Sequence, residues 1–129
     1  MTGEHHDAGE AVDGVLGALA DPTRRRLLDL LAEHGQASAT TLAERLPVSR
    51  QAVVKHLAVL DAAGLVSSSR VGREVRYAVR PAALNATARW MAALAADWDR
   101  RLATIKRVAE AAEESQRAEQ SDQAERDSR

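Results

Sequence analysis

The sequence predicts a mainly helical domain that carries one β-hairpin. Apolar residues recur at helical spacing over most of the 129 residues, one short stretch alternates with a period of two, and glycine or proline separates these segments. Alanine, leucine and arginine are frequent and phenylalanine is absent, which also favours helices. The expected order is four helices, two strands and a last helix (α-α-α-α-β-β-α).

The first two helices are predicted from apolar spacing and from residues that favour helix ends. The apolar residues of the first helix are Val12, Val15, Leu16 and Leu19. Asp21 is a good N-cap residue, and Pro22 stands at a position that favours proline, the first of a helix. The second helix should run from there to about His34, because Gly35 is typical of the residue that ends a helix.

The next two helices have the spacing of a helix-turn-helix. A short helix is expected over 40–46, Pro47 breaks it, and Ser49 opens a helix that runs to about Ala63 before Gly64. A break of three or four residues between two helices is typical of this motif. Strands follow over 65–70 and 73–79, with Val71-Gly72 as the tight turn between them. A hairpin directly after such a helix pair predicts a winged helix-turn-helix.

The last helix is expected to open at Pro81 and to run past Val108. A heptad seam follows it, made of Leu84, Ala88, Met91, Ala95, Trp98, Leu102, Ile105 and Ala109. Part of this stripe must pack inside its own chain, but the helix is longer than the rest of the domain can cover. We therefore expect a homodimer through the first and last helices. The predicted interface residues are Val15, Leu16, Leu19, Trp90, Leu94, Trp98 and Leu102.

Composition bounds the organisation of the chain. Residues 1–10 are expected to be disordered, residues 11–113 to form the folded domain, and residues 114–129 to form a charged tail. No secretory signal or membrane-spanning run is visible, so we expect a cytoplasmic protein. The absence of cysteine excludes disulfides, thiolate metal sites and thiol catalysis.

Charge is segregated along the chain although the net charge is only -1. Residues 1–20, 21–80, 81–108 and 109–129 carry formal charges of -4, +4, +3 and -4. A basic middle between acidic ends predicts a surface that binds a polyanion. A solvated charged surface with no partner explains the same pattern equally well.

The helix that opens at Ser49 carries side chains suited to reading DNA. Its inward face is formed by Val53, Leu57 and Leu60, and its outward face by Arg50, Gln51, Val54 and Lys55. In the major groove, arginine binds guanine bidentately, glutamine pairs with adenine, and an apolar group contacts the thymine methyl. The Ser49 hydroxyl caps this helix, and the helix N-terminus can hold a phosphate. The alternative is an ordinary surface helix.

The hairpin adds three arginines. Arg70 and Arg73 flank its tip, and Arg76 lies on the second strand. Their expected partners are DNA phosphates or the minor groove, whereas the alternative is an edge hairpin protected by charge.

Three segments, ALADPTRRRLLDLL, LAERLPVSRQAVVKHLAVLDAAGLV and GREVRYAV, resemble the ArsR-type winged helix-turn-helix regulators of bacteria. The resemblance covers about residues 12–109. It implies a homodimeric repressor of transcription that binds an imperfect inverted repeat in double-stranded DNA, often in its own promoter. It also implies that SRQAVVKHLAVL is the recognition helix and the hairpin arginines are wing residues. The DNA-facing residues would be Ser49, Arg50, Gln51, Lys55 and His56, although His56 fits a half-buried structural role as well.

The chain departs from the metal-sensing members of this family, and it fits a subgroup with a tryptophan-bearing last helix. It has no thiolate, and Asp97 and Asp99 point to different faces of the last helix. His34 is isolated, and His5-His6-Asp7 lies in the segment expected to be disordered. We therefore predict no metal site and no cofactor, and the sequence names no small-molecule effector.

Two other classes of function, an enzyme and a protein-binding adaptor, fit the sequence less well than DNA binding. No phosphate-binding glycine loop, GxSxG or HExxH motif is present, which argues against an enzyme. A winged-helix adaptor that binds another protein would more often carry an apolar patch than cations on its outward helix face.

Overall fold

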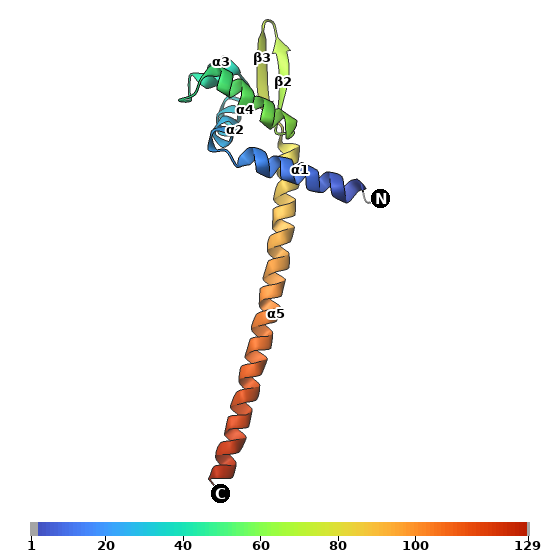
Figure 1. Cartoon of the computed structure of the whole chain (residues 1–129), viewed down its shortest axis with the longest axis vertical. Coiled ribbons are helices and arrows are strands. Elements are labelled where there is room, and N and C mark those ends of the chain that lie inside the picture. Colours follow the sequence, from blue (N-terminus) through green and yellow to red (C-terminus); the bar gives the residue numbers. More distant parts are fainter. Residues whose placement is uncertain (1–2, 129) are drawn as a thin grey trace. The chain divides into compact units, whose positions relative to one another are not determined.

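The computed structural model describes residues 3–128 of the chain, with side chains described from Gly9 onward. Its elements are α1 (Gly3–Leu19), α2 (Pro22–His34), β1 (Ala37–Ser38), α3 (Ala39–Ala43), α4 (Arg50–Ala62), β2 (Val66–Val71), β3 (Glu74–Val79) and α5 (Pro81–Asp127) (Figure 1). The predicted winged helix-turn-helix is confirmed. The chain divides into two compact units, with the boundary between Trp90 and Met91 inside α5.

The core of the first unit is aliphatic and lies where α1, α2, α4 and the base of the hairpin meet. Leu27 and Leu31 from α2 are fully buried with Leu57 and Leu60 from α4. Each pair is spaced by three or four residues and lies on one helix face, so burying the pair turns the opposite face outward. The orientation of α4 therefore follows from its apolar residues.

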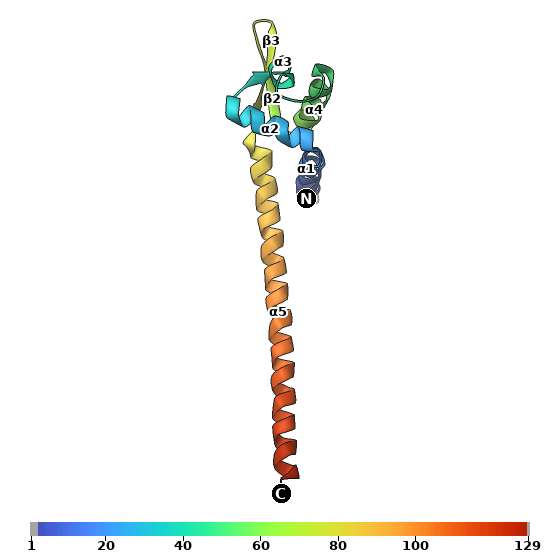
Figure 2. The ribbon, with the colours of Figure 1, turned by 90° about the vertical axis from the view of Figure 1, so that its left-hand side faces the viewer.

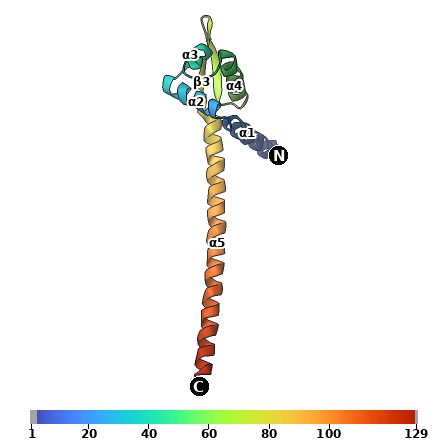
Figure 3. The same ribbon diagram turned by 60° about the vertical axis from the view of Figure 1, so that its left-hand side comes forward.

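The sheet has three antiparallel strands in the order β1-β3-β2. Within the hairpin, Val66 lies opposite Val79 and Val71 lies opposite Glu74. The turn is therefore Gly72-Arg73, one residue later than predicted, because Gly72 takes the first turn position with a φ of +64°. The hairpin tip extends beyond α3 and α4 in every view (Figures 1 and 3).

Strand β1 was not predicted. It has two residues, and Ala37 pairs with Tyr77 while Ser38 pairs with Arg76. So short a segment carries no periodicity, and its pairing partner lies far along the chain. Because β1 pairs with β3, the start of α3 lies next to the hairpin.

The helix ends confirm most of the predicted caps. The Asp21 carboxylate accepts hydrogen bonds from the amides of Thr23 at 2.8 Å and Arg24 at 3.2 Å. The Gly35 amide donates to the Leu31 carbonyl at 2.8 Å with a φ of +79° at Gly35. These local signals depend on neighbours in the sequence, which is why the sequence predicts them well.

The break between α3 and α4 is longer than predicted. Helix α3 ends at Ala43 rather than near Leu46, and α4 begins at Arg50. The Arg45 amide donates to the Leu42 carbonyl and the Leu46 amide to the Ala43 carbonyl, so the chain turns more tightly than an α-helix there. This turn buries the Leu46 side chain in the core.

Both ends of the described chain are helical, at the N-terminal segment expected to be disordered and along the expected charged tail. Helix α1 begins at Gly3 and α5 continues to Asp127, while residues 1, 2 and 129 lie outside the described residues. The end of α5 is exposed throughout and rich in good helix formers, and Arg117 pairs with Glu113 at 3.8 Å. The boundaries of the folded domain at residues 11 and 113 stay a prediction.

The second unit is the part of α5 that begins at Met91, and its uninterrupted ribbon is clear in Figure 2. None of the helices described over residues 3–128 combines the length and the apolar character needed to cross a bilayer.

Candidate nucleic-acid interface

The outward face of α4 carries the side chains predicted to read DNA. Arg50, Gln51 and Lys55 are exposed, and Val54 keeps 39% of its surface exposed. The Ser49 hydroxyl accepts a hydrogen bond from the Ala52 amide at 3.1 Å and so caps the helix as expected. The side chains predicted on this face are thus all outward; that they contact DNA stays a prediction.

Arg50 is held by a residue that sequence reasoning missed. Its Nε donates to the Thr40 hydroxyl of α3 at 3.0 Å. Arg50 and Thr40 line one cleft with Arg73 of the hairpin turn. No local pattern links Thr40 with Arg50, because the two meet only after α3 packs beside α4.

The three hairpin arginines do not share one surface. Arg73 lies in the turn itself, and Arg70 lies opposite Val75. Arg76 lies opposite Ser69, and successive strand residues point to opposite faces, so Arg76 and Arg70 face opposite sides. The Arg76 Nε also donates to the Glu74 carboxylate at 3.1 Å. Of these three arginines, Arg73 lines the cleft with Arg50 and Val54 of α4.

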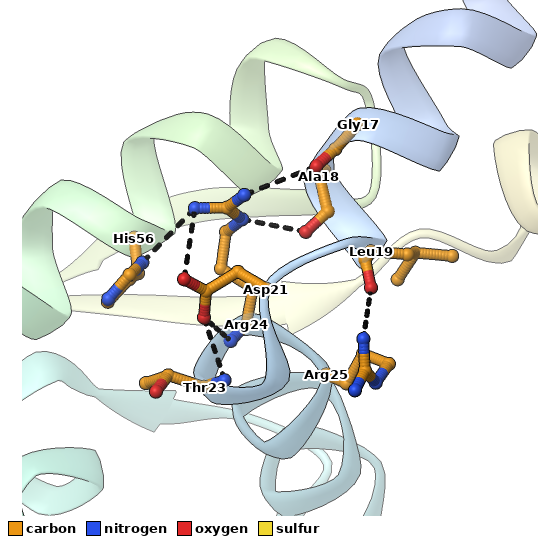
Figure 4. Close-up of polar contacts among 8 residues, drawn as sticks. All are labelled: Gly17, Ala18, Leu19, Asp21, Thr23, Arg24, Arg25 and His56. Atoms are coloured by element: carbon orange, nitrogen blue, oxygen red, sulfur yellow. Dashed lines mark hydrogen bonds and ion pairs between the residues drawn. The ribbon is translucent and has the colours of Figure 1, made fainter.

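His56 is half-buried and lies beside the α1–α2 junction (Figure 4). Its Nδ1 is 3.4 Å from a terminal nitrogen of Arg24. The Arg24 guanidinium also donates to the carbonyls of Ala18 at 2.6 Å and Gly17 at 3.2 Å. Of the two roles left open for His56, this contact supports the half-buried structural one.

The Asp21 carboxylate belongs to the same network, and Arg24 approaches it to 3.9 Å (Figure 4). Desolvation acts to raise its pKa. The backbone hydrogen bonds from Arg24 and Thr23, with the positive charges of His56 and Arg24, outweigh that effect and hold the pKa of Asp21 below its ordinary value of 3.8. The folded state therefore favours the ionised carboxylate.

Replacing Asp21 by asparagine is expected to destabilise the chain at neutral pH and to have little effect in acid. Asparagine still caps a helix but carries no charge. Because the pKa of Asp21 is depressed on folding, its charge stabilises the fold fully above the ordinary value of 3.8, and this stability is lost as the pH falls through the folded-state pKa. Urea midpoints of both proteins measured across this range should converge in acid. A constant difference would contradict a role for the charge.

The residues predicted to form a dimer interface are placed unequally. Val15 is fully buried in the core of its own chain, so we remove it from the predicted interface. Leu19 is half-buried and Leu16 is exposed. From Trp90 onward, the large apolar side chains of α5 are 44–65% exposed: Trp90, Met91, Leu94, Trp98, Leu102, Ile105 and Val108. The Arg101 guanidinium lies 5.5 Å from the Trp98 ring centre and pairs with Asp97 at 3.1 Å.

Among the side chains that the structure describes, no three carboxylate or imidazole groups gather as a metal site would require. The His5-His6-Asp7 segment lies outside the described side chains.

Comparison with known proteins places this geometry in a family. A helix-turn-helix domain family matches residues 19–68. The transcriptional repressor SdpR of Bacillus subtilis is 34% identical over 80 residues, which are 62% of this chain and 88% of SdpR. The solved structure of an ArsR-like transcriptional regulator from Rhodococcus sp. RHA1 is 50% identical with a TM-score of 0.70, covering 77% of this chain and 92% of that one.

This chain belongs to the family of ArsR-like transcriptional regulators. The regulator Rv2034 of Mycobacterium tuberculosis, at 45% identity over 83 residues, covers 64% of this chain and 70% of its own length. Members of this family are transcriptional regulators and not enzymes. In this ArsR-like chain the family's helix-turn-helix is α3 and α4, and its wing is the β2–β3 hairpin.

Proposed function

We propose that this chain is a homodimeric transcriptional repressor that binds an inverted repeat in a promoter and does not respond to metal ions. The observation that carries the proposal is the outward face of α4, with its two cations and one amide beside the wing, in an ArsR-like chain. The relative SdpR is named a transcriptional repressor, which supports repression over activation.

In this proposal the first turns of α4 enter the major groove. Gln51, Val54 and Lys55 are exposed. Gln51 can pair with adenine, Val54 can contact the thymine methyl, and Lys55 can donate to a base edge that carries acceptors. A two-fold dimer places two such helices about one helical turn of DNA apart, which is why the expected site is an inverted repeat. A dimer bound at such a site would repress transcription by occupying the promoter.

The apolar row on α5 supports the dimer. Large exposed apolar patches often mark protein–protein interaction sites, and this row repeats at the spacing of a coiled-coil seam. A second copy of the same helix presents a matching row, and Leu16 and Leu19 of α1 add to the proposed interface.

The proposed independence from metal ions rests on which residue types the chain contains. The full sequence holds no cysteine, so no thiolate can bind a soft metal ion. Release of bound DNA by low micromolar zinc or nickel would overturn this part of the proposal.

The test is a binding titration against the DNA upstream of the chain's own gene, with random duplex as competitor, at two salt concentrations. We expect a preference of about 10³-fold or more with a steep salt dependence. Equal binding to both duplexes would remove the chain's own promoter as the target. Absence of binding at low salt would favour a winged-helix adaptor.

A further inference from the structure

A cleft of about 340 Å³ lies between α3, the start of α4 and the hairpin turn. Arg50 and Arg73 stand on its walls, while Val54 and Val75 give it an apolar part. Such a lining fits a ligand that combines an anion with an apolar ring.

The electrostatics of the cleft favour an anion. Among the described residues that line it, Glu74 supplies the one carboxylate, and the Arg76 Nε binds that carboxylate at 3.1 Å. Arg76 thus offsets the acid, and the charges of Arg50 and Arg73 are left facing the cleft.

Arg50 is oriented before any ligand arrives. A guanidinium has five N–H donors, and the Thr40 hydroxyl takes the one on Nε at 3.0 Å. The terminal amino groups, which bind phosphate oxygens in pairs, are left for a ligand. This fixed orientation lowers the entropy lost when an anion binds.

We propose that Arg50, oriented by Thr40, and Arg73 together bind one phosphate of the DNA backbone in each half-site, with Val54 and Val75 against the adjoining deoxyribose. Arg50 then positions the recognition helix and does not read guanine. Val54 contacts a sugar here instead of a thymine methyl, so base recognition falls to Gln51 and Lys55. The inference rests on the proposed function, because it assigns residues within the same DNA complex.

The test replaces single phosphates of the selected operator by neutral methylphosphonates. At one phosphate in each half-site, we expect neutralisation to weaken binding by wild-type protein about tenfold. For Arg73→Gln and Thr40→Val the same change should cost less than it costs the wild type. Arg73→Gln lacks one of the two guanidinium groups, and Thr40→Val no longer orients Arg50. Thr40→Ser should restore the wild-type response.

Two controls separate this role from others. Arg126→Gln removes the same charge from the last turn of α5 and should leave the phosphate response unchanged. Gln51→Ala should lower the preference for operator over random duplex and keep the phosphate response. In contrast, Arg50→Gln and Arg73→Gln should weaken binding to both duplexes by the same factor.

Each further outcome is decisive. If Arg50→Gln lowers the operator preference while every phosphate keeps its effect, Arg50 reads a base and the phosphate assignment is wrong. Inorganic phosphate could instead displace DNA more strongly than chloride does at equal ionic strength, and only when Thr40 is present. If no methylphosphonate has an effect as well, the cleft binds free phosphate and not a phosphate of the DNA. If wild-type protein prefers no duplex at all, the proposed function itself fails.

Discussion

Replacing both Trp98 and Leu102 by glutamate is expected to convert the proposed dimer into monomers and to weaken operator binding at least about 100-fold. Both side chains are more than half exposed in the isolated chain, at 53% and 57%. Burying a large apolar side chain contributes about 1.5–3 kcal/mol to association. With two replacements in each chain, the interface loses four such side chains and gains four negative charges. A monomer also loses the advantage of binding two half-sites at once.

The matched control places the same charges elsewhere on α5. Ala96→Glu with Ala103→Glu adds two acids at exposed positions that helical spacing puts on the other side of the helix. Sedimentation velocity should show a dimer for the control and a monomer for the Trp98–Leu102 variant, with equal helix content by circular dichroism. A dimer that survives in both variants would show that α5 does not hold the two copies together.

Replacing Arg50 and Lys55 by alanine is expected to abolish specific DNA binding and leave the dimer intact. A dimer loses four cations from its DNA-facing surface, and a hydrogen bond to a charged group contributes about 1.5–3 kcal/mol. Affinity should therefore fall about 10³-fold or more. The slope of binding against salt should also flatten, since fewer counterions are released.

The matched control removes one arginine and one lysine from the second unit. Arg100 pairs with Asp97 at 3.6 Å and Lys106 with Glu110 at 4.0 Å, both within α5. Arg100→Ala with Lys106→Ala should bind DNA nearly as well as wild type in the same anisotropy titration. If both double variants lose affinity equally, net charge and not the face of α4 governs binding. Retained specific binding by the α4 variant would place the interface elsewhere.

Local signals explain why much of the fold is predictable from the sequence. Asp21 and Ser49 cap their helices through neighbouring amides, and Gly35 closes α2 through a backbone conformation that glycine favours. The outward face of α4 follows from the spacing of three buried residues on the opposite side. Each of these depends on residues within about one or two helical turns, so spacing and residue type suffice.

Contacts between distant segments account for what was missed. Thr40 meets Arg50 only because α3 packs beside α4, and His56 meets Arg24 across 32 residues. The pairing of β1 with β3 has the same origin. Spacing also identified Arg70, Arg73 and Arg76 as wing residues, but it did not show that Arg70 and Arg76 lie on opposite faces of the hairpin. The role of His56 could not be decided from one helix, because its partner stands on another.

The α1–α2 junction changes how the run Arg24-Arg25-Arg26 should be interpreted. Arg24 donates to the carbonyls of Gly17 and Ala18, and Arg25 donates to that of Leu19 at 2.6 Å. Two guanidinium groups therefore donate to the last carbonyls of α1, at the negative end of its dipole, where a capping backbone amide or a water often donates in other helices. The N–H groups that donate to these carbonyls are not available to a phosphate at the same time. A count of basic residues thus overstates the donors free to contact a polyanion, because Arg24 and Arg25 also join α2 to the end of α1.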